Sequence, residues 1–148
     1  MPDFRTLRRR TGHPVGERIT MEFYYDDLIG VPFVDGGRDV KTGLDCWGLC
    51  LEAFRRQGVA VKNYHIAAVD AERIADEMQK EEPDWVKLEE PVVGCLVVIK
   101  LTPGCWANHA GIYVGEGRFL HAYSPTGSCI DRLKRWKSRI VGYYRPGR

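Results

Sequence analysis

Apolar residues recur at helical spacing in the first half of the chain. Cys46, Cys50 and Phe54 follow one another at intervals of four, and a glycine at position 58 stands where glycine commonly ends a helix. These positions predict a helix of about three turns that begins near residue 46. Apolar residues share one stripe again between residues 71 and 82, after Asp70 and before a proline. We therefore predict a second amphipathic helix there.

The second half of the chain changes to patterns typical of strands. Residues 94–101 form a nearly continuous run of apolar and β-branched side chains, as in a strand that is covered on both faces. Residues 108–114 and 118–123 are predicted to form a hairpin around a three-residue loop, and residues 139–145 one further strand. Helices first and antiparallel strands afterwards predict an α+β fold in a single domain.

The predicted hairpin brings two of the four histidines to one face. With a three-residue loop, Val114 pairs with Arg118. His121 then lies opposite Gly111, and His109 is its diagonal neighbour on the adjacent strand, with the backbones of the two residues about 7–8 Å apart. We therefore expect the two imidazoles to touch. The opposite face is predicted to join the core through Ala110, Ile112, Val114, Leu120 and Ala122.

Length and composition limit the classes of protein that fit. A chain of 148 residues with 44% hydrophobic and 28% charged residues is typical of one globular domain. We predict that this domain spans residues 21–148 and follows a poorly ordered arm, residues 1–20, which holds five arginines and two acidic residues. An arm this short, with no aromatic stacking surface, does not favour nucleic-acid binding. The chain has no apolar run long enough to span a membrane, and no apolar segment after the arginines that would make a signal peptide, so we expect synthesis in the cytoplasm.

Cys46 is the strongest candidate for a nucleophile among five cysteines whose odd number and spacing do not favour disulfides. The start of a helix stabilises a thiolate and lowers a cysteine pKa from about 8.5 to roughly 3.5–7.5. The Cys46 backbone N–H also offers one donor to an oxyanion. A nucleophilic cysteine needs a base that a further polar group orients, and His109 with His121 meets that need.

A zinc site is the competing interpretation of the same residues. Cys46, Cys50, Cys105 and His109 can be drawn as a Cys₃His set. Structural zinc sites usually contain tight C-x₂-C spacings, which are absent here. We therefore predict no metal and no organic cofactor.

Three strings of residues resemble a known family. GLDCWGL at 43–49, NHAGIYVG at 108–115 and FLHA at 119–122 are similar to motifs of the NlpC family of papain-like cell-wall cysteine peptidases. The stretches 36–39 and 141–146 resemble the branch of that family encoded with phage tail genes. The resemblance extends over roughly residues 23–146. It implies a compact papain-like α+β domain in which N-terminal helices pack on an antiparallel sheet.

The resemblance also implies an activity and its residues. Cys46 would be the nucleophile, His109 the general base and acid, and His121 the residue that orients His109. Such enzymes hydrolyse an amide bond of peptidoglycan stem peptides, typically between γ-D-glutamate and a diamino acid, through a thioester and without a cofactor. The family pattern further implies a substrate-facing or helix-capping Asp45, Trp47 where many relatives have serine, and an upstream aromatic near the cysteine. Either Tyr24 or Tyr25 fits that last role.

The resemblance is also compatible with a function that is not enzymatic. A phage tail-tip structural or assembly component can keep the same fold with little or no hydrolytic activity. Keeping Cys46, His109 and His121 argues for the enzyme, because a scaffold needs none of them. In either case we expect the partners to be peptidoglycan and phage tail-tip proteins, and the place of action to be a phage or phage-like tail at the bacterial cell wall.

Overall fold

The structure is a computed structural model and describes residues 23–64, 70–123 and 126–147. The predicted basic arm, residues 1–20, lies outside these ranges. The elements of the described residues are the 3₁₀ helices η2 (Asp26–Leu28), η3 (Glu82–Asp84) and η4 (Leu133–Arg139), the helices α1 (Cys46–Arg56) and α2 (Ala71–Glu81), and the strands β1 (Arg38–Asp39), β2 (Gly43–Leu44), β3 (Trp85–Leu88), β4 (Leu96–Ile99), β5 (His109–Gly115), β6 (Arg118–Tyr123), β7 (Gly127–Arg132) and β8 (Ile140–Pro146).

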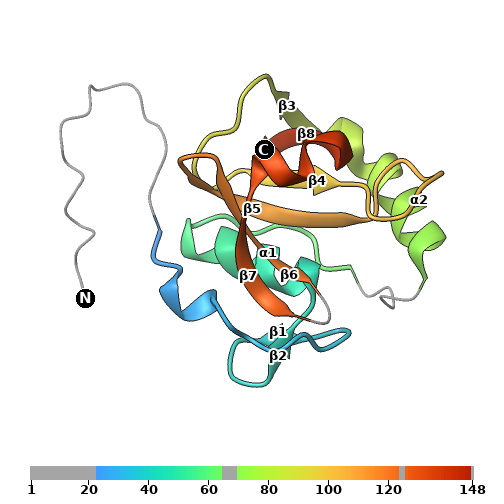
Figure 1. The fold of residues 1–148 in the computed structure, drawn as a ribbon. Helices are drawn as coiled ribbons and strands as arrows, with labels where there is room; N and C mark the ends of the chain where they lie inside the picture. Colours follow the sequence, from blue (N-terminus) through green and yellow to red (C-terminus); the bar gives the residue numbers. More distant parts are fainter. Residues whose placement is uncertain (1–22, 65–69, 124–125, 148) are drawn as a thin grey trace.

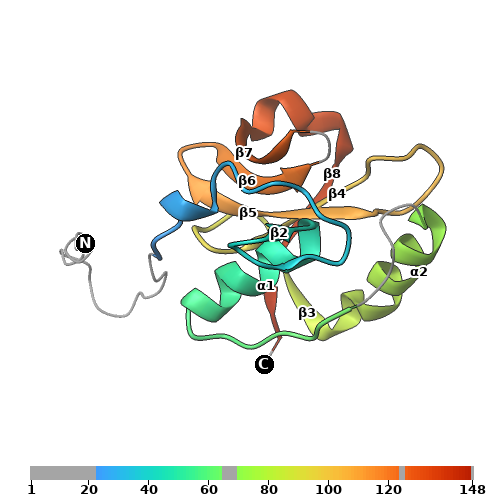
Figure 2. The same ribbon diagram turned by 90° about the horizontal axis from the view of Figure 1, so that it is seen from below.

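One antiparallel sheet organises the fold. Its six strands follow the order β3-β8-β4-β5-β6-β7, and β1 pairs with β2 in a separate small ribbon. Helices α1 and α2 lie on one side of the large sheet and η4 on the other (Figures 1 and 2). The predicted α+β class, with helices packed on an antiparallel sheet, is confirmed.

Each face of the sheet carries its own apolar cluster. The face toward α1 includes the alternate residues of the hairpin that the sequence assigned to the core, and all of them are buried there. The other face holds the smaller cluster of Val97, Ile99, Phe119 and Trp136. Because both faces are covered, β4 is buried along its whole length, as its continuous apolar run predicts.

The hairpin between β5 and β6 has the predicted register but a different turn. Ile112 lies opposite Leu120, which continues to Gly111 opposite His121. The three-residue loop is wrong. Glu116 and Gly117 both have positive φ and form a tight two-residue turn, and an irregularity before Gly115 restores the register.

The sequence pattern missed the two edge strands of the sheet. β3 and β7 were not predicted because edge strands are held by backbone pairing and need few apolar residues. β7 is nevertheless fully paired with β6, and His121 lies directly opposite Cys129. No helix of the described residues is long and apolar enough to cross a membrane.

Candidate active site

The start of α1 is fixed by the carboxylate of Asp45. Its Oδ1 accepts hydrogen bonds from the Gly48 backbone N–H at 2.7 Å and from Arg38 Nη1 at 2.6 Å. Its Oδ2 accepts one from the Gly36 N–H at 3.0 Å. These bonds cap the helix and supply hydrogen-bond donors to the buried carboxylate. They also hold Cys46, the first residue of α1, in place.

Gly48 allows the loop before the helix to approach this closely. A Cβ at this position would lie 2.0 Å from the carbonyl oxygen of Gly37, so any side chain would force the helix and the loop apart. The glycine at position 48 of the GLDCWGL string is therefore required for packing.

The two histidines of the hairpin are in contact, as predicted. His109 Nε2 lies 2.8 Å from His121 Nδ1, and His121 Nε2 lies 2.9 Å from Asp131 Oδ2 on β7. A carboxylate only accepts hydrogen bonds, so Nε2 of His121 carries its proton and Nδ1 accepts from His109. That assignment leaves Nδ1 of His109 unprotonated and able to act as a base.

Aromatic rings hold His121 in one orientation. Its ring stacks on Tyr123 with an interplanar angle of 10° and meets Trp136 edge-on at 5.2 Å between centroids. Phe119 packs against it at 4.5 Å. Since His121 is fully buried, the ring has little freedom to rotate, and its two nitrogens stay aimed at His109 and Asp131.

Cys46 and His109 line the same cleft, of about 260 Å³, between α1, the sheet and α2. The Cys46 sulfur lies within hydrogen-bonding reach of the backbone of Ala110, the residue after His109. The start of α1 and the hairpin therefore lie next to each other at this point of the cleft. Its other walls combine aliphatic residues such as Ile74 with many aromatic and acidic ones: Phe33, Trp47, Tyr64, Trp85, Trp106, Tyr123, Tyr144, Glu77, Glu81 and Glu82.

Burial shifts the pKa of Cys46 upward, whereas the sequence predicted a lowered pKa for this thiol. Burial, with a contribution from the Asp45 carboxylate, raises the pKa of the Cys46 thiol to about 12. Burial, with a contribution from His121, lowers the pKa of His109 to about 3. The lowered thiol pKa expected from the helix start is therefore wrong. The neutral thiol and the neutral imidazole are the favoured forms.

The other residues proposed from the sequence fall into two groups. Trp47 lines the cleft and donates its ring N–H to the Lys62 carbonyl at 2.7 Å. Tyr24 and Tyr25 do not line this cleft: the Tyr24 carbonyl accepts a hydrogen bond from Arg56, at the far end of α1 from Cys46, and Tyr25 packs against the main core. The aromatic residue that the upstream loop does bring to the cleft is Phe33.

The Cys₃His zinc site drawn from the sequence does not assemble among the described residues. Cys50 is fully buried in the core behind Cys46, and the Cys105 thiol donates a hydrogen bond to the Thr102 carbonyl at 3.2 Å. The cluster of possible metal ligands in the described part of the chain lies elsewhere and contains His121 but not His109.

Asp131 is the functional candidate that the sequence analysis missed. It lies on an edge strand that the apolar pattern did not reveal, opposite Phe119 and two residues after the partner of His121. The alternation of Cys129 and Asp131 after the Gly127 turn was the available signal, because residues two apart on a strand share a face.

Comparison with known proteins identifies the family to which this site belongs. The model of the NlpC/P60 family matches residues 30–145, which is most of the chain. The chain belongs to the NlpC/P60 family. Among solved structures, an NLP/P60 family protein of Staphylococcus aureus is 25% identical with a TM-score of 0.58, and the match covers 85% of this chain and 43% of that one. An NlpC/P60 protein of Bacillus cereus, 18% identical with a TM-score of 0.61, shares the fold.

Two curated NlpC/P60 relatives are enzymes by name. The chain is 30% identical over 140 residues to the gamma-DL-glutamyl hydrolase of Bacillus subtilis, a match that covers 93% of this chain and 32% of the relative. It is 31% identical over 117 residues to the murein DD-endopeptidase MepS/murein LD-carboxypeptidase of Escherichia coli K12, covering 78% of this chain and 55% of the relative. The chain thus spans about a third to about half the length of these relatives.

Proposed function

We propose that the chain is a cysteine peptidase that hydrolyses an amide bond in peptidoglycan stem peptides. The observation that carries the proposal is the continuous series of polar groups that starts at the cleft, in which His109 contacts His121 and His121 contacts Asp131. Cys46 enters the same cleft from the start of α1. Relatives named as murein endopeptidases and as a glutamyl hydrolase support the choice of substrate.

The proposed reaction uses His109 first as base and then as acid. Nδ1 of His109 takes the proton of the Cys46 thiol as the sulfur attacks the substrate carbonyl, so no preformed thiolate is required. The same proton is then given to the leaving amine when the carbon–nitrogen bond breaks and a thioester remains. Water, deprotonated by His109, hydrolyses the thioester and regenerates the thiol.

The first turn of α1 stabilises the charge that develops in this reaction. The N–H groups of Cys46 and Trp47 have no intrahelical acceptor, because the first turn of any helix lacks one. They lie next to the sulfur and are available to the oxyanion of the tetrahedral intermediate. His121 and Asp131 act as positioning residues, since His121 contacts His109, Asp131 contacts His121, and neither contacts the substrate.

The bond that we propose is the one between γ-D-glutamate and a diamino acid. Two relatives support it by name: the gamma-DL-glutamyl hydrolase and the bifunctional muramidase/DL-endopeptidase CwlT of Bacillus subtilis, to which the chain is 30% identical over 119 residues. A DD-endopeptidase named among the relatives cuts a different class of bond and is the natural comparison in the test.

Muropeptide analysis tests this function. Purified peptidoglycan is incubated with the wild-type chain, with Cys46→Ala, and with Cys105→Ser as the matched control, because Cys105 is another partly exposed cysteine outside the cleft. We expect a new fragment that ends in D-glutamate with wild type and Cys105→Ser, and none with Cys46→Ala. Unchanged muropeptides in all three digests would indicate the structural tail role instead, and products of a D,D bond would overturn the bond assignment.

We also propose that the chain reaches the wall as part of a phage or phage-like tail. Support comes from the stretches 36–39 and 141–146, which resemble the tail-associated branch of the family. The test is immunodetection of the chain in purified particles from a strain that carries it. We expect the chain to co-sediment with intact tails, and its presence only in particle-free fractions would contradict the proposal.

A further inference from the structure

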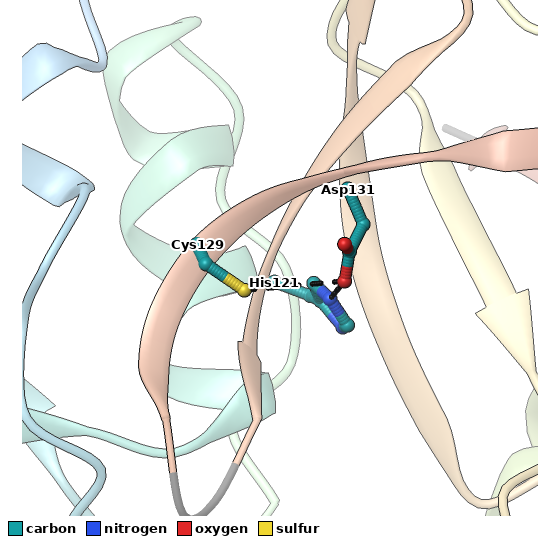
Figure 3. Close-up of side chains that lie close together, drawn as sticks. All are labelled: His121, Cys129 and Asp131. Atoms are coloured by element: carbon teal, nitrogen blue, oxygen red, sulfur yellow. Dashed lines mark hydrogen bonds and ion pairs between the residues drawn. The ribbon is translucent and has the colours of Figure 1, made fainter. Parts of the chain in front are cut away.

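A second cluster of reactive side chains lies at the far end of the histidine pair. His121 on β6 and Cys129 and Asp131 on β7 converge on one point (Figure 3). One ligand atom from each lies within 4.8 Å of the others. His121 Nε2 is 2.9 Å from Asp131 Oδ2, and the Cys129 thiol faces the same oxygen at 4.0 Å. The proposed reaction makes no use of Cys129.

We propose that His121, Cys129 and Asp131 form an inhibitory site for a thiophilic divalent cation such as Zn²⁺. Imidazole nitrogen, thiolate sulfur and carboxylate oxygen together are the ligand types that select this ion over Mg²⁺ or Ca²⁺. A water molecule would complete the fourth position. Binding at this site does not depend on the proposed peptidase activity, whereas its inhibitory consequence rests on that activity.

The geometry of the strands suits such a site. Bond lengths of about 2.0 Å to nitrogen and oxygen and about 2.3 Å to sulfur place tetrahedral ligand atoms about 3.3–3.5 Å apart, so the three atoms need to shift by about an ångström. His121 is held by its aromatic neighbours, but Cys129 and Asp131 are partly exposed and free to adjust. Their exposure also gives the ion a route from solvent.

The charged and polar neighbours of the site permit an ion to enter. Arg135 lies 3.6 Å from the other oxygen of Asp131, and its side chain is 73% exposed, so it can turn into solvent when a cation binds. Thr126 Oγ1 lies 3.9 Å from the Cys129 sulfur and adds a weak further contact. Asp131 then gives up its hydrogen bond from His121 Nε2 and its ion pair with Arg135, and a coordinate bond to the ion replaces them.

Occupancy of the site would reverse the direction of the hydrogen bonds that prepare His109. A metal on Nε2 of His121 requires a lone pair there, so the proton of His121 moves to Nδ1. Nδ1 then donates to Nε2 of His109, and the proton of His109 moves to its own Nδ1. Each imidazole keeps one proton, and the only proton released to solvent is that of the Cys129 thiol. The base that should accept the Cys46 proton is thereby lost without any contact between the ion and Cys46.

Metal binding is tested in the full chain with Cys46→Ala, which removes the competing thiol at the cleft. Co²⁺ is added in place of Zn²⁺, because thiolate ligation to Co²⁺ gives a near-ultraviolet charge-transfer band. We expect a band at one Co²⁺ per chain, which is lost in Cys46→Ala/Cys129→Ser and kept in the matched Cys46→Ala/Cys105→Ser. A band that survives Cys129→Ser, or that Cys105→Ser removes, or no band at all, would overturn the site.

The predicted reversal has a direct readout in the same Cys46→Ala chain. With ¹⁵N-labelled histidine, we expect the proton of His109 on Nε2 before Zn²⁺ is added and on Nδ1 afterwards. Nitrogen spectra in which His109 keeps its tautomer while His121 binds the metal would rule out the inhibitory mechanism and leave the metal site standing.

Activity provides the third measurement. Zn²⁺ is titrated into wild type, Cys129→Ser and Cys105→Ser during muropeptide release. We expect equal basal rates and an inhibitory Zn²⁺ concentration at least about tenfold higher for Cys129→Ser than for the other two, since the variant lacks one metal ligand. Equal sensitivity of all three chains would place any inhibition at Cys46 and contradict the proposal. Failure of all three to release fragments would instead contradict the proposed function, while the Co²⁺ result stands by itself.

Discussion

Helices α1 and α2 have the same length of 11 residues and both follow an aspartate, yet they form two different walls of the cleft. Asp45 makes a side-chain cap on α1, whereas Asp70 makes none on α2. Five residues of α1 are buried, whereas α2 buries only Ala75. The wall that carries the proposed chemistry is therefore fixed by many contacts, while the wall opposite is held by few and is suited to substrate contact.

The largest effect is expected behind the fixed wall, at Asp131. Asp131→Asn keeps the shape of the side chain but can donate a hydrogen bond to His121 Nε2, which favours the wrong tautomer of both histidines. We expect kcat to fall by up to about 10⁴ with little change in KM, as when the carboxylate of a catalytic triad is replaced by an amide. Steady-state kinetics that follow the released stem peptide give kcat and KM separately. An effect on KM alone would contradict the positioning role.

The second largest effect concerns the reactivity of Cys46. Its thiol pKa of about 12 against the ordinary 9.0 corresponds to roughly a thousandfold smaller thiolate fraction at neutral pH. We expect iodoacetamide to label Cys46 more slowly than a peptide thiol at pH 7, with a rate that keeps rising toward alkaline pH. The Cys46→Ala chain provides the background labelling of the other cysteines. A rate plateau below pH 7 would indicate a preformed thiolate–imidazolium pair and a site less enclosed than the structure shows.

The third effect is a difference in stability between substitutions at the two aspartates that precede α1 and α2. Asp45→Ala removes a helix cap and leaves the guanidinium of Arg38 without its carboxylate, so we expect a loss of about 3 kcal/mol in the free energy of unfolding. Asp70→Ala on α2 is the matched variant and should cost less than about 0.5 kcal/mol, because no cap bond is lost. Urea unfolding of both variants measures the difference, and equal losses would show that the two helices are not held differently.

The same contrast explains what the sequence predicted and what it did not. Periodicity predicted α1, α2 and the four inner strands because each places apolar residues on one stripe or face. The alternation around His109 and His121 predicted that the two rings are in contact. Asp131 escaped because β7 is stabilised by pairing with β6 and not by apolar burial. The pKa of Cys46 was misjudged because a helix start is a local feature, whereas burial depends on how α1 packs against the hairpin.

The smallest effect is expected on the opposite wall, at Ile74. This side chain of α2 is partly buried and lines the cleft, while Glu72 on the same helix is exposed and does not. We expect Ile74→Ala to raise KM by a factor of about ten or less with kcat unchanged, because it removes binding that substrate and transition state share. Glu72→Ala should alter neither constant. A fall in kcat for Ile74→Ala would mean that α2 also positions the reacting groups, and the distinction between a wall for chemistry and a wall for binding would no longer hold.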